Sequence, residues 1–201
     1  DFRPVFRCRP AMGYVLAYTA HNFELFAFRS WMVAFLFYVQ STQPEANVGM
    51  TATQLAAIIN LSGLPASVLG NELAVKIGRQ RAITLVMLSS AFVAMSLGFM
   101  ATLPFWTLFF VCILYNMTIL GDSGAITAGV VGAAPEGYKG ATMAVHTCIG
   151  FMGSFLGPLA FGIALDLVGG GASILSWGFA FGAVGLTTAI IGPLALIWAR
   201  R

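Results

Sequence analysis

The stretch AITLVMLSSAFVAMSLGFMA, residues 82–101, decides the fold class of this chain, because it contains no charged residue. A helix needs about 20 predominantly apolar residues to cross the hydrocarbon core of a bilayer, and this stretch is that long. The whole chain has the same character: 59% of its residues are hydrophobic, 8% are charged, and its mean hydropathy is +0.88. Soluble domains carry roughly 25% charged residues. The composition therefore predicts a protein whose solvent is lipid.

Similar apolar stretches recur along the chain and predict an all-α membrane domain over residues 11–201. Its six expected transmembrane helices cover residues 11–39, 52–74, 82–101, 104–132, 139–166 and 174–199. The connections between them are short, so neighbouring helices should be antiparallel. Residues 1–10 precede the first span and form a basic leader.

The orientation in the membrane follows from the Lys and Arg residues outside the spans, because cytoplasmic loops are enriched in these residues. They occur only before span one, between spans two and three, between spans four and five, and after span six. These are Arg3, Arg7, Arg9, Lys76, Arg79, Arg81, Lys139, Arg200 and Arg201. The pattern predicts that both termini are cytoplasmic.

Span one carries most of the ionisable residues, in YVLAYTAHNFELFAFRSW, residues 14–31. A charge at membrane depth costs at least about 2.5–3.5 kcal/mol on insertion scales, so each one needs a reason. His21 and Glu24 are three residues apart and should share a helical face near the midplane. They are predicted either to bind substrate or a proton, or to form an internal pair that fixes the helix. Arg29 lies farther out and is predicted to anchor at the outer interface or attract anions at an outer mouth.

Polar residues also occur in spans two, four and five, whereas spans three and six have no ionisable residue in their interiors. Asn60 and Asn116 are predicted to line a cavity or to bond neighbouring helices. Asp122 is placed near the cytoplasmic end of span four. His146 should lie about 9 Å inside that end of span five and make a structural or gating contact. The distribution predicts a cavity lined by spans one, two, four and five.

Span five contains a glycine and proline pattern. Gly153 and Gly157 have the spacing of a close-packing face. Pro158 follows, and because it lacks a backbone N–H it is expected to bend the helix. A bend at this position would be useful to a protein whose parts rock around a central site.

Two stretches resemble motifs of the major facilitator superfamily. NELAVKIGRQR, residues 71–81, resembles its loop signature Gly-x-x-x-Asp-Arg-x-Gly-Arg-Arg, which Lys76, Gly78 and Arg79 match. GFMGSFLGPLAFGIALD, residues 150–166, resembles the glycine-proline helix found in span five of each half. Span one also resembles the seventh helix of bacterial members. The loop departs from the signature at three positions, Asn71, Val75 and Gln80.

The resemblance implies that this chain is the C-terminal six-helix half of a twelve-helix secondary transporter, and that residues 1–10 end the linker between the halves. Each half of such a transporter is a pair of inverted three-helix repeats. In this family an arginine at the position of Arg79 latches onto an acid at the end of the fourth helix, here Asp122. Such a latch would close the cytoplasmic side in one state.

The expected function is therefore transport of a small solute across the bacterial inner membrane by alternating access, with proton coupling as a hypothesis. The expected partners are the lipid bilayer, the N-terminal six-helix half, the solute and protons. No cofactor, metal or nucleic acid is expected, and the three cysteines, Cys8, Cys112 and Cys148, show no metal-ligand spacing.

Two other functions compete with this interpretation. GDSG, residues 121–124, resembles the serine setting of rhomboid intramembrane proteases, with Ser123 as the nucleophile. A serine nucleophile needs a base within hydrogen-bond reach, and span six, which carries it in rhomboids, has no His here. The other alternative is a self-standing six-helix channel or homodimeric carrier.

Overall fold

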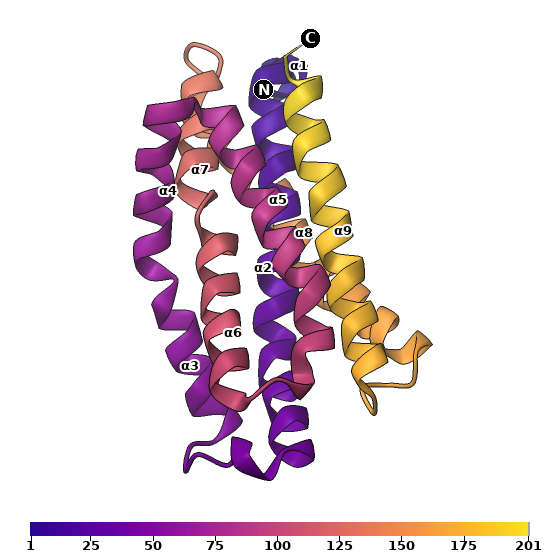
Figure 1. The fold of residues 1–201 in the computed structure, drawn as a ribbon. Helices are drawn as coiled ribbons and strands as arrows, with labels where there is room; N and C mark the ends of the chain where they lie inside the picture. Colours follow the sequence, from indigo (N-terminus) through magenta and orange to yellow (C-terminus); the bar gives the residue numbers. More distant parts are fainter. Residues whose placement is uncertain (201) are drawn as a thin grey trace.

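The structure is a computed structural model that describes residues 1–200, and all regular secondary structure within these residues is helical (Figure 1). Its α-helices are α1 (Arg3–Arg7), α2 (Arg9–Thr42), α3 (Ala52–Ser62), α4 (Leu64–Ile77), α5 (Arg79–Leu97), α6 (Phe105–Leu120), α7 (Ser123–Ala133), α8 (Lys139–Leu167) and α9 (Ile174–Trp198). Two short 3-10 helices, η1 (Pro44–Ala46) and η2 (Gly98–Thr102), lie in connections. The predicted leader forms α1 and the start of α2.

Five helical segments are long and apolar enough to cross a membrane. They are Ala52–Ile77, Arg79–Thr102, Phe105–Ala133, Lys139–Leu167 and Ile174–Trp198, and they match the last five predicted spans within a few residues. The protein is therefore a multi-pass membrane protein.

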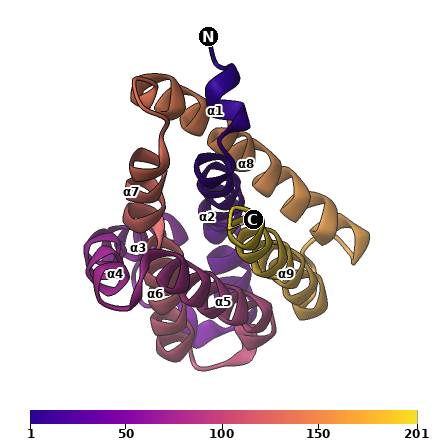
Figure 2. The same ribbon diagram turned by 90° about the horizontal axis from the view of Figure 1, so that it is seen from above.

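The first predicted span, α2, is not among these five segments because it is too polar, although its 34 residues extend over roughly 51 Å. His21, Asn22 and Glu24 on this helix are all buried. Seen from above, α2 lies in the middle of the bundle (Figure 2), where it packs against α7, α8 and α9. A central position allows the most polar helix to keep its ionisable side chains away from lipid.

Both termini lie at one end of the bundle, together with the α4–α5 and α7–α8 connections (Figure 1). We call this the terminus end. A side-chain hydrogen bond from Arg200 to Gln80 joins the last helix to the start of α5 there. The described cations outside the spans all belong to segments at this end, as the charge pattern predicts. Its assignment to the cytoplasm remains a prediction.

Two of the membrane-crossing segments are broken. α3 and α4 meet at Gly63, and α6 and α7 meet at Gly121 and Asp122. Asn116 on α6 donates from Nδ2 to the carbonyl of Ile59 at 2.6 Å and to that of Asn60 at 3.3 Å. These carbonyls lie in the last turn of α3, where the helix ends at Gly63 and its final carbonyls lack regular intrahelical partners. Asn116 thus makes a helix–helix hydrogen bond, which is one of the two roles expected for it.

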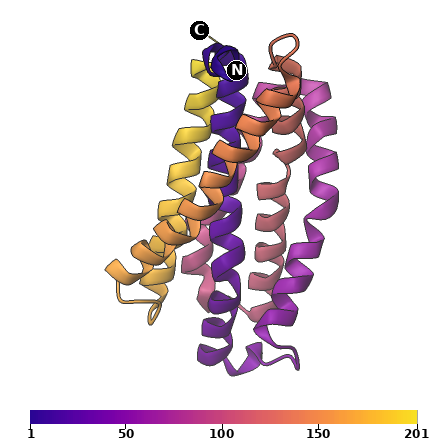
Figure 3. The ribbon, with the colours of Figure 1, turned by 180° about the vertical axis from the view of Figure 1, so that it is seen from behind.

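The interface between α2 and α8 is built on glycines, and Figure 3 shows the two helices crossing. A Cβ atom on Gly153 would overlap the carbonyl oxygen of Thr19, and one on Gly157 would overlap that of Phe23. The predicted close-packing face is thus confirmed. α8 continues through Pro158, whose carbonyl accepts a hydrogen bond from Trp31 Nε1 at 2.9 Å.

Candidate functional site

The structure pairs His21 with Asp122 deep inside the bundle. His21 Nδ1 lies 2.7 Å from Asp122 Oδ1, and both side chains are only 2% exposed. The atoms are at ion-pair distance, but the ring N–H is not aligned for a directed hydrogen bond to this oxygen. Asp122 is the N-cap residue of α7 and makes no side-chain capping bond. Its carboxyl group is therefore free to face His21 while it lies at the positive end of the α7 dipole.

Tyr18 connects this pair to His146 on α8. The Tyr18 ring stacks on His21 with centroids 5.6 Å apart and planes 14° apart. On His146 its centroid distance is 4.0 Å and the planes are tilted by 32°. His146 is buried, and its Nδ1 atom has no hydrogen-bond partner among the described residues. We call Tyr18, His21, Asp122 and His146 the imidazole cluster. It joins α2, α7 and α8 at the break before α7.

Glu24 belongs to a separate network. Its carboxylate accepts hydrogen bonds from Ser90 Oγ at 3.0 Å and from Tyr115 OH at 3.1 Å, and it is 1% exposed. Within residues 1–200, no cationic group lies at ion-pair distance from Glu24. We call Glu24, Ser90 and Tyr115 the carboxyl–hydroxyl network. It holds α2 against α5 and α6 through neutral donors.

The internal pair of His21 with Glu24 that the sequence suggested is therefore wrong. A spacing of three residues leaves their directions roughly 60° apart around the helix. At the centre of a bundle this difference is enough for each side chain to meet a different neighbouring helix. Ser90 was not predicted from the sequence, because span three has no ionisable residue in its interior and a hydroxyl is not ionisable at neutral pH. A lone hydroxyl in an apolar span was the available signal.

Asn60 and Asn116 lie at the break between α3 and α4, and both keep a buried side-chain oxygen without a hydrogen-bond partner among the described residues. The structure assigns the amide nitrogen of Asn116 to a structural bond and leaves its oxygen free. The cavity-lining role predicted for both residues remains a prediction.

The expected latch between Arg79 and Asp122 is not formed in this structure, and because it would close only one state, it remains a prediction. Arg79 Nη1 donates instead to the carbonyl of Ala128 at 3.3 Å. The reason is depth: α7 has 11 residues and extends roughly 16 Å beyond Asp122 toward the terminus end. The sequence placed Asp122 nearer that end, because the interruption of span four at Gly121 and Asp122 was not predicted.

Arg29 is half-buried on α2, and its Nε atom is buried without a hydrogen-bond partner within residues 1–200. It lies eight residues after His21, which corresponds to about 12 Å along the helix. Arg29 is therefore not part of the imidazole cluster. Its role at an outer mouth remains a prediction.

Ser123 is the first residue of α7 and is half-buried. Within residues 1–200, no hydrogen bond joins Ser123 to either histidine, and His21 faces the neighbouring Asp122 instead. Within the same residues, no group of three His, Cys, Asp or Glu side chains is placed to hold a metal ion.

The imidazole cluster is the strongest candidate site because its His21, Asp122 and His146 side chains are buried, and because it lies where a membrane-crossing helix is interrupted. Comparisons of the chain with models of protein families, with curated proteins and with solved structures found no match.

Proposed function

We propose that this chain is the C-terminal six-helix half of a secondary active transporter, which moves a small solute across the bacterial inner membrane by alternating access coupled to protons. The observation that carries the proposal is the buried His21–Asp122 pair at the α6–α7 break. Such intramembrane pairs are expensive and are typical of ion pathways and proton relays.

The chemistry of the pair suits proton exchange. A protonated His21 and an ionised Asp122 are neutral together, whereas gain or loss of one proton leaves a net charge in a water-excluded site. Histidine is the side chain that exchanges protons most readily near neutral pH. A conformational change that admits water or a charged solute would therefore change the protonation of the pair, and this links proton binding to movement.

The surrounding backbone supports the same function. Discontinuous transmembrane helices are the usual places where secondary transporters bind solutes and coupling ions. Two such helices lie side by side here, with breaks at Gly63 and Gly121. A Cβ on Gly63 would overlap the side chains of Leu120 and Asn116. Because each break packs against the other broken helix, a movement of one helix would displace the other.

Asp122→Asn tests the proposal in the complete protein that contains this chain. Inverted membrane vesicles are loaded with a pH-sensitive dye and given a panel of radiolabelled organic acids, sugars and amino acids. The wild type should accumulate one of them against its gradient and move protons with it. Asp122→Asn should lose uphill accumulation and keep solute exchange, because the amide cannot carry the proton.

Ser123→Ala is the matched control, since it changes the adjacent residue and should leave both activities unchanged. Uphill accumulation by the Asp122→Asn variant would contradict proton coupling through the pair. Loss of all activity in Ser123→Ala, with proteolysis of a membrane substrate by the wild type, would favour the protease alternative.

A further inference from the structure

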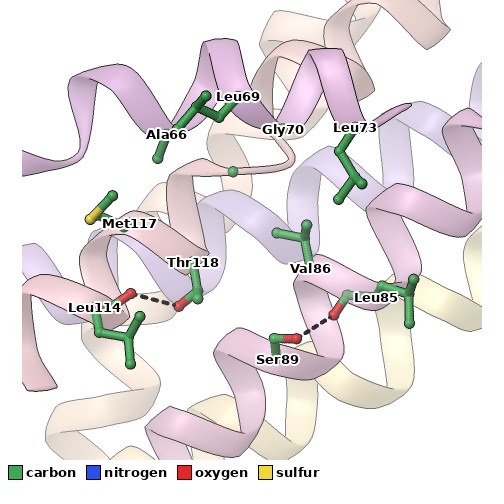
Figure 4. Close-up of a pocket in the computed structure, with 11 residues that line it drawn as sticks. Ala66, Leu69, Gly70, Leu73, Leu85, Val86, Ser89, Leu114, Met117 and Thr118 are labelled. Carbon is green, nitrogen blue, oxygen red and sulfur yellow. Dashed lines mark hydrogen bonds between the residues drawn. The ribbon is translucent and has the colours of Figure 1, made fainter. Parts of the chain in front are cut away.

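An apolar groove runs along the outside of the bundle between α4, α5 and α6 (Figure 4). Its volume is about 370 Å³, and an adjoining cavity of about 560 Å³ shares four of its lining residues, Leu85, Ser89, Leu114 and Thr118. The second cavity extends the groove along α5 to Phe92 and Val93. The helices that form this surface are long and apolar enough to cross a membrane, so the groove is at the depth of the hydrocarbon region.

The groove offers no free hydroxyl donor to a ligand. Ser89 Oγ donates to the Leu85 carbonyl at 2.8 Å, and Thr118 Oγ1 donates to the Leu114 carbonyl at 3.1 Å, as the dashed lines in Figure 4 show. The other labelled side chains in the groove are apolar. A polar solute would lose its hydration here without replacement, whereas a hydrocarbon chain would not.

Positive charge lies at one end of the groove. Lys76 is three residues after Leu73, and Arg81 is four residues before Leu85, so each cation shares a helical face with a lining residue. Both are exposed at the terminus end. The one ion pair within residues 1–200 is His21–Asp122, so neither Lys76 nor Arg81 is neutralised by a carboxylate, including the exposed Glu72 nearby.

We propose that this groove binds one acyl chain of an anionic phospholipid, whose phosphate is held by Lys76 and Arg81. An amphiphile with an anionic head fits this site, because its apolar chain would occupy the groove and its head would meet the unpaired cations at the terminus end. A helix from a second copy of the chain would also fill an apolar groove, but it would gain nothing from the charges.

A lipid in the groove would contact the break between α6 and α7. Gly70 and Gly121 both line it, and a Cβ on Gly70 would overlap the Gly121 carbonyl oxygen. An acyl chain in the groove therefore lies against the break between α6 and α7. The binding itself does not depend on the transport function proposed above.

Native mass spectrometry of the purified full-length protein tests the site, with phosphatidylglycerol and phosphatidylcholine of identical acyl chains as the probes. The wild type should retain phosphatidylglycerol over phosphatidylcholine. Lys76→Gln and Arg81→Gln should each weaken phosphatidylglycerol binding about fivefold, the effect of one cation near a membrane surface. Lys139→Gln, which removes an exposed cation from the start of α8, is the matched control and should change nothing.

Ser89→Phe tests the groove independently of charge. It should fill the groove and lower the binding of both lipids, whereas Ser96→Phe, two turns farther along α5 and outside both cavities, should not. Thermal unfolding of each variant verifies that it is folded. The proposal is overturned if the double variant Lys76→Gln/Arg81→Gln retains phosphatidylglycerol like the wild type. It is equally overturned if Ser89→Phe leaves lipid binding unchanged and instead dissociates a dimer.

Discussion

The imidazole cluster and the carboxyl–hydroxyl network lie about one helical turn apart on α2, yet the buried acid in each has a different kind of partner. Asp122 faces an ionisable partner, His21, at the loose end of a broken helix. Glu24 faces two hydroxyl donors, Ser90 on α5 and Tyr115 on α6, both well inside their helices. The first arrangement can exchange a proton between its members, whereas the second can hold a carboxyl group and the helices around it. Burial alone therefore does not show which of the two carboxyl groups can exchange a proton.

The largest expected effect comes from replacing His21 by glutamine, with Glu24→Gln as the comparison. His21→Gln should lower uphill transport at least about a hundredfold, which is the range for loss of a proton-transferring group. Glu24→Gln should retain most of the transport, because an amide oxygen still accepts a bond from Tyr115 or Ser90. Initial rates of solute-driven proton movement in vesicles measure both. Equal losses in the two variants would remove the distinction between the two regions.

The second prediction concerns stability, where we expect the carboxyl–hydroxyl network, and not the imidazole cluster, to matter most. Glu24→Leu should lower the free energy of unfolding by about 1–3 kcal/mol, because the buried Tyr115 hydroxyl is left without its acceptor. The Ser90 hydroxyl should lose less, since its single hydrogen can be donated instead to the Met87 carbonyl, 3.0 Å from Oγ. Denaturant unfolding in detergent, monitored by tryptophan fluorescence, gives the value. An unchanged midpoint would show that the network does not hold α2 in place.

A smaller effect is expected at the break between α3 and α4. Asn116→Ala should cost about 1 kcal/mol, because the carbonyl of Ile59 loses a buried donor. Asn60→Ala is the control, since the Asn60 side-chain oxygen has no hydrogen-bond partner in the described part of the chain. The same unfolding experiment compares them. A greater loss in Asn60→Ala would indicate that the side chains support the break differently.

The smallest effect is expected from Arg79, which lies outside both regions. Arg79→Gln should change the free energy of unfolding by less than about 1 kcal/mol, because it removes one partly buried hydrogen bond to the Ala128 carbonyl.

The expected latch is tested by a charge exchange. Asp122→Arg should abolish transport, and adding Arg79→Asp should not restore it, because Arg79 does not face Asp122 in this structure. Restored transport in the double variant would revive the latch inferred from the family resemblance.

Much of the fold follows from local properties of the sequence. The apolar stretches located five crossing helices within a few residues, and the cations outside the spans gathered at one end as expected. The glycines at positions 153 and 157 were correctly identified as a packing face. The candidate residues His21, Asp122 and His146 were also named individually, because ionisable groups in apolar surroundings are conspicuous. Their grouping with Tyr18 was not foreseen.

The sequence by itself determined which segments cross the membrane and which residues need a partner there, because transfer into lipid is a cost that each residue carries wherever it packs. Only the tertiary structure decided which residues are the partners of these buried polar groups. The rotation of α2, the break at Gly121 and the crossing of α8 place His21 against Asp122 and Glu24 against Ser90 and Tyr115. A turn of roughly 60° on one helix separates these two outcomes, and only contacts between helices set that angle.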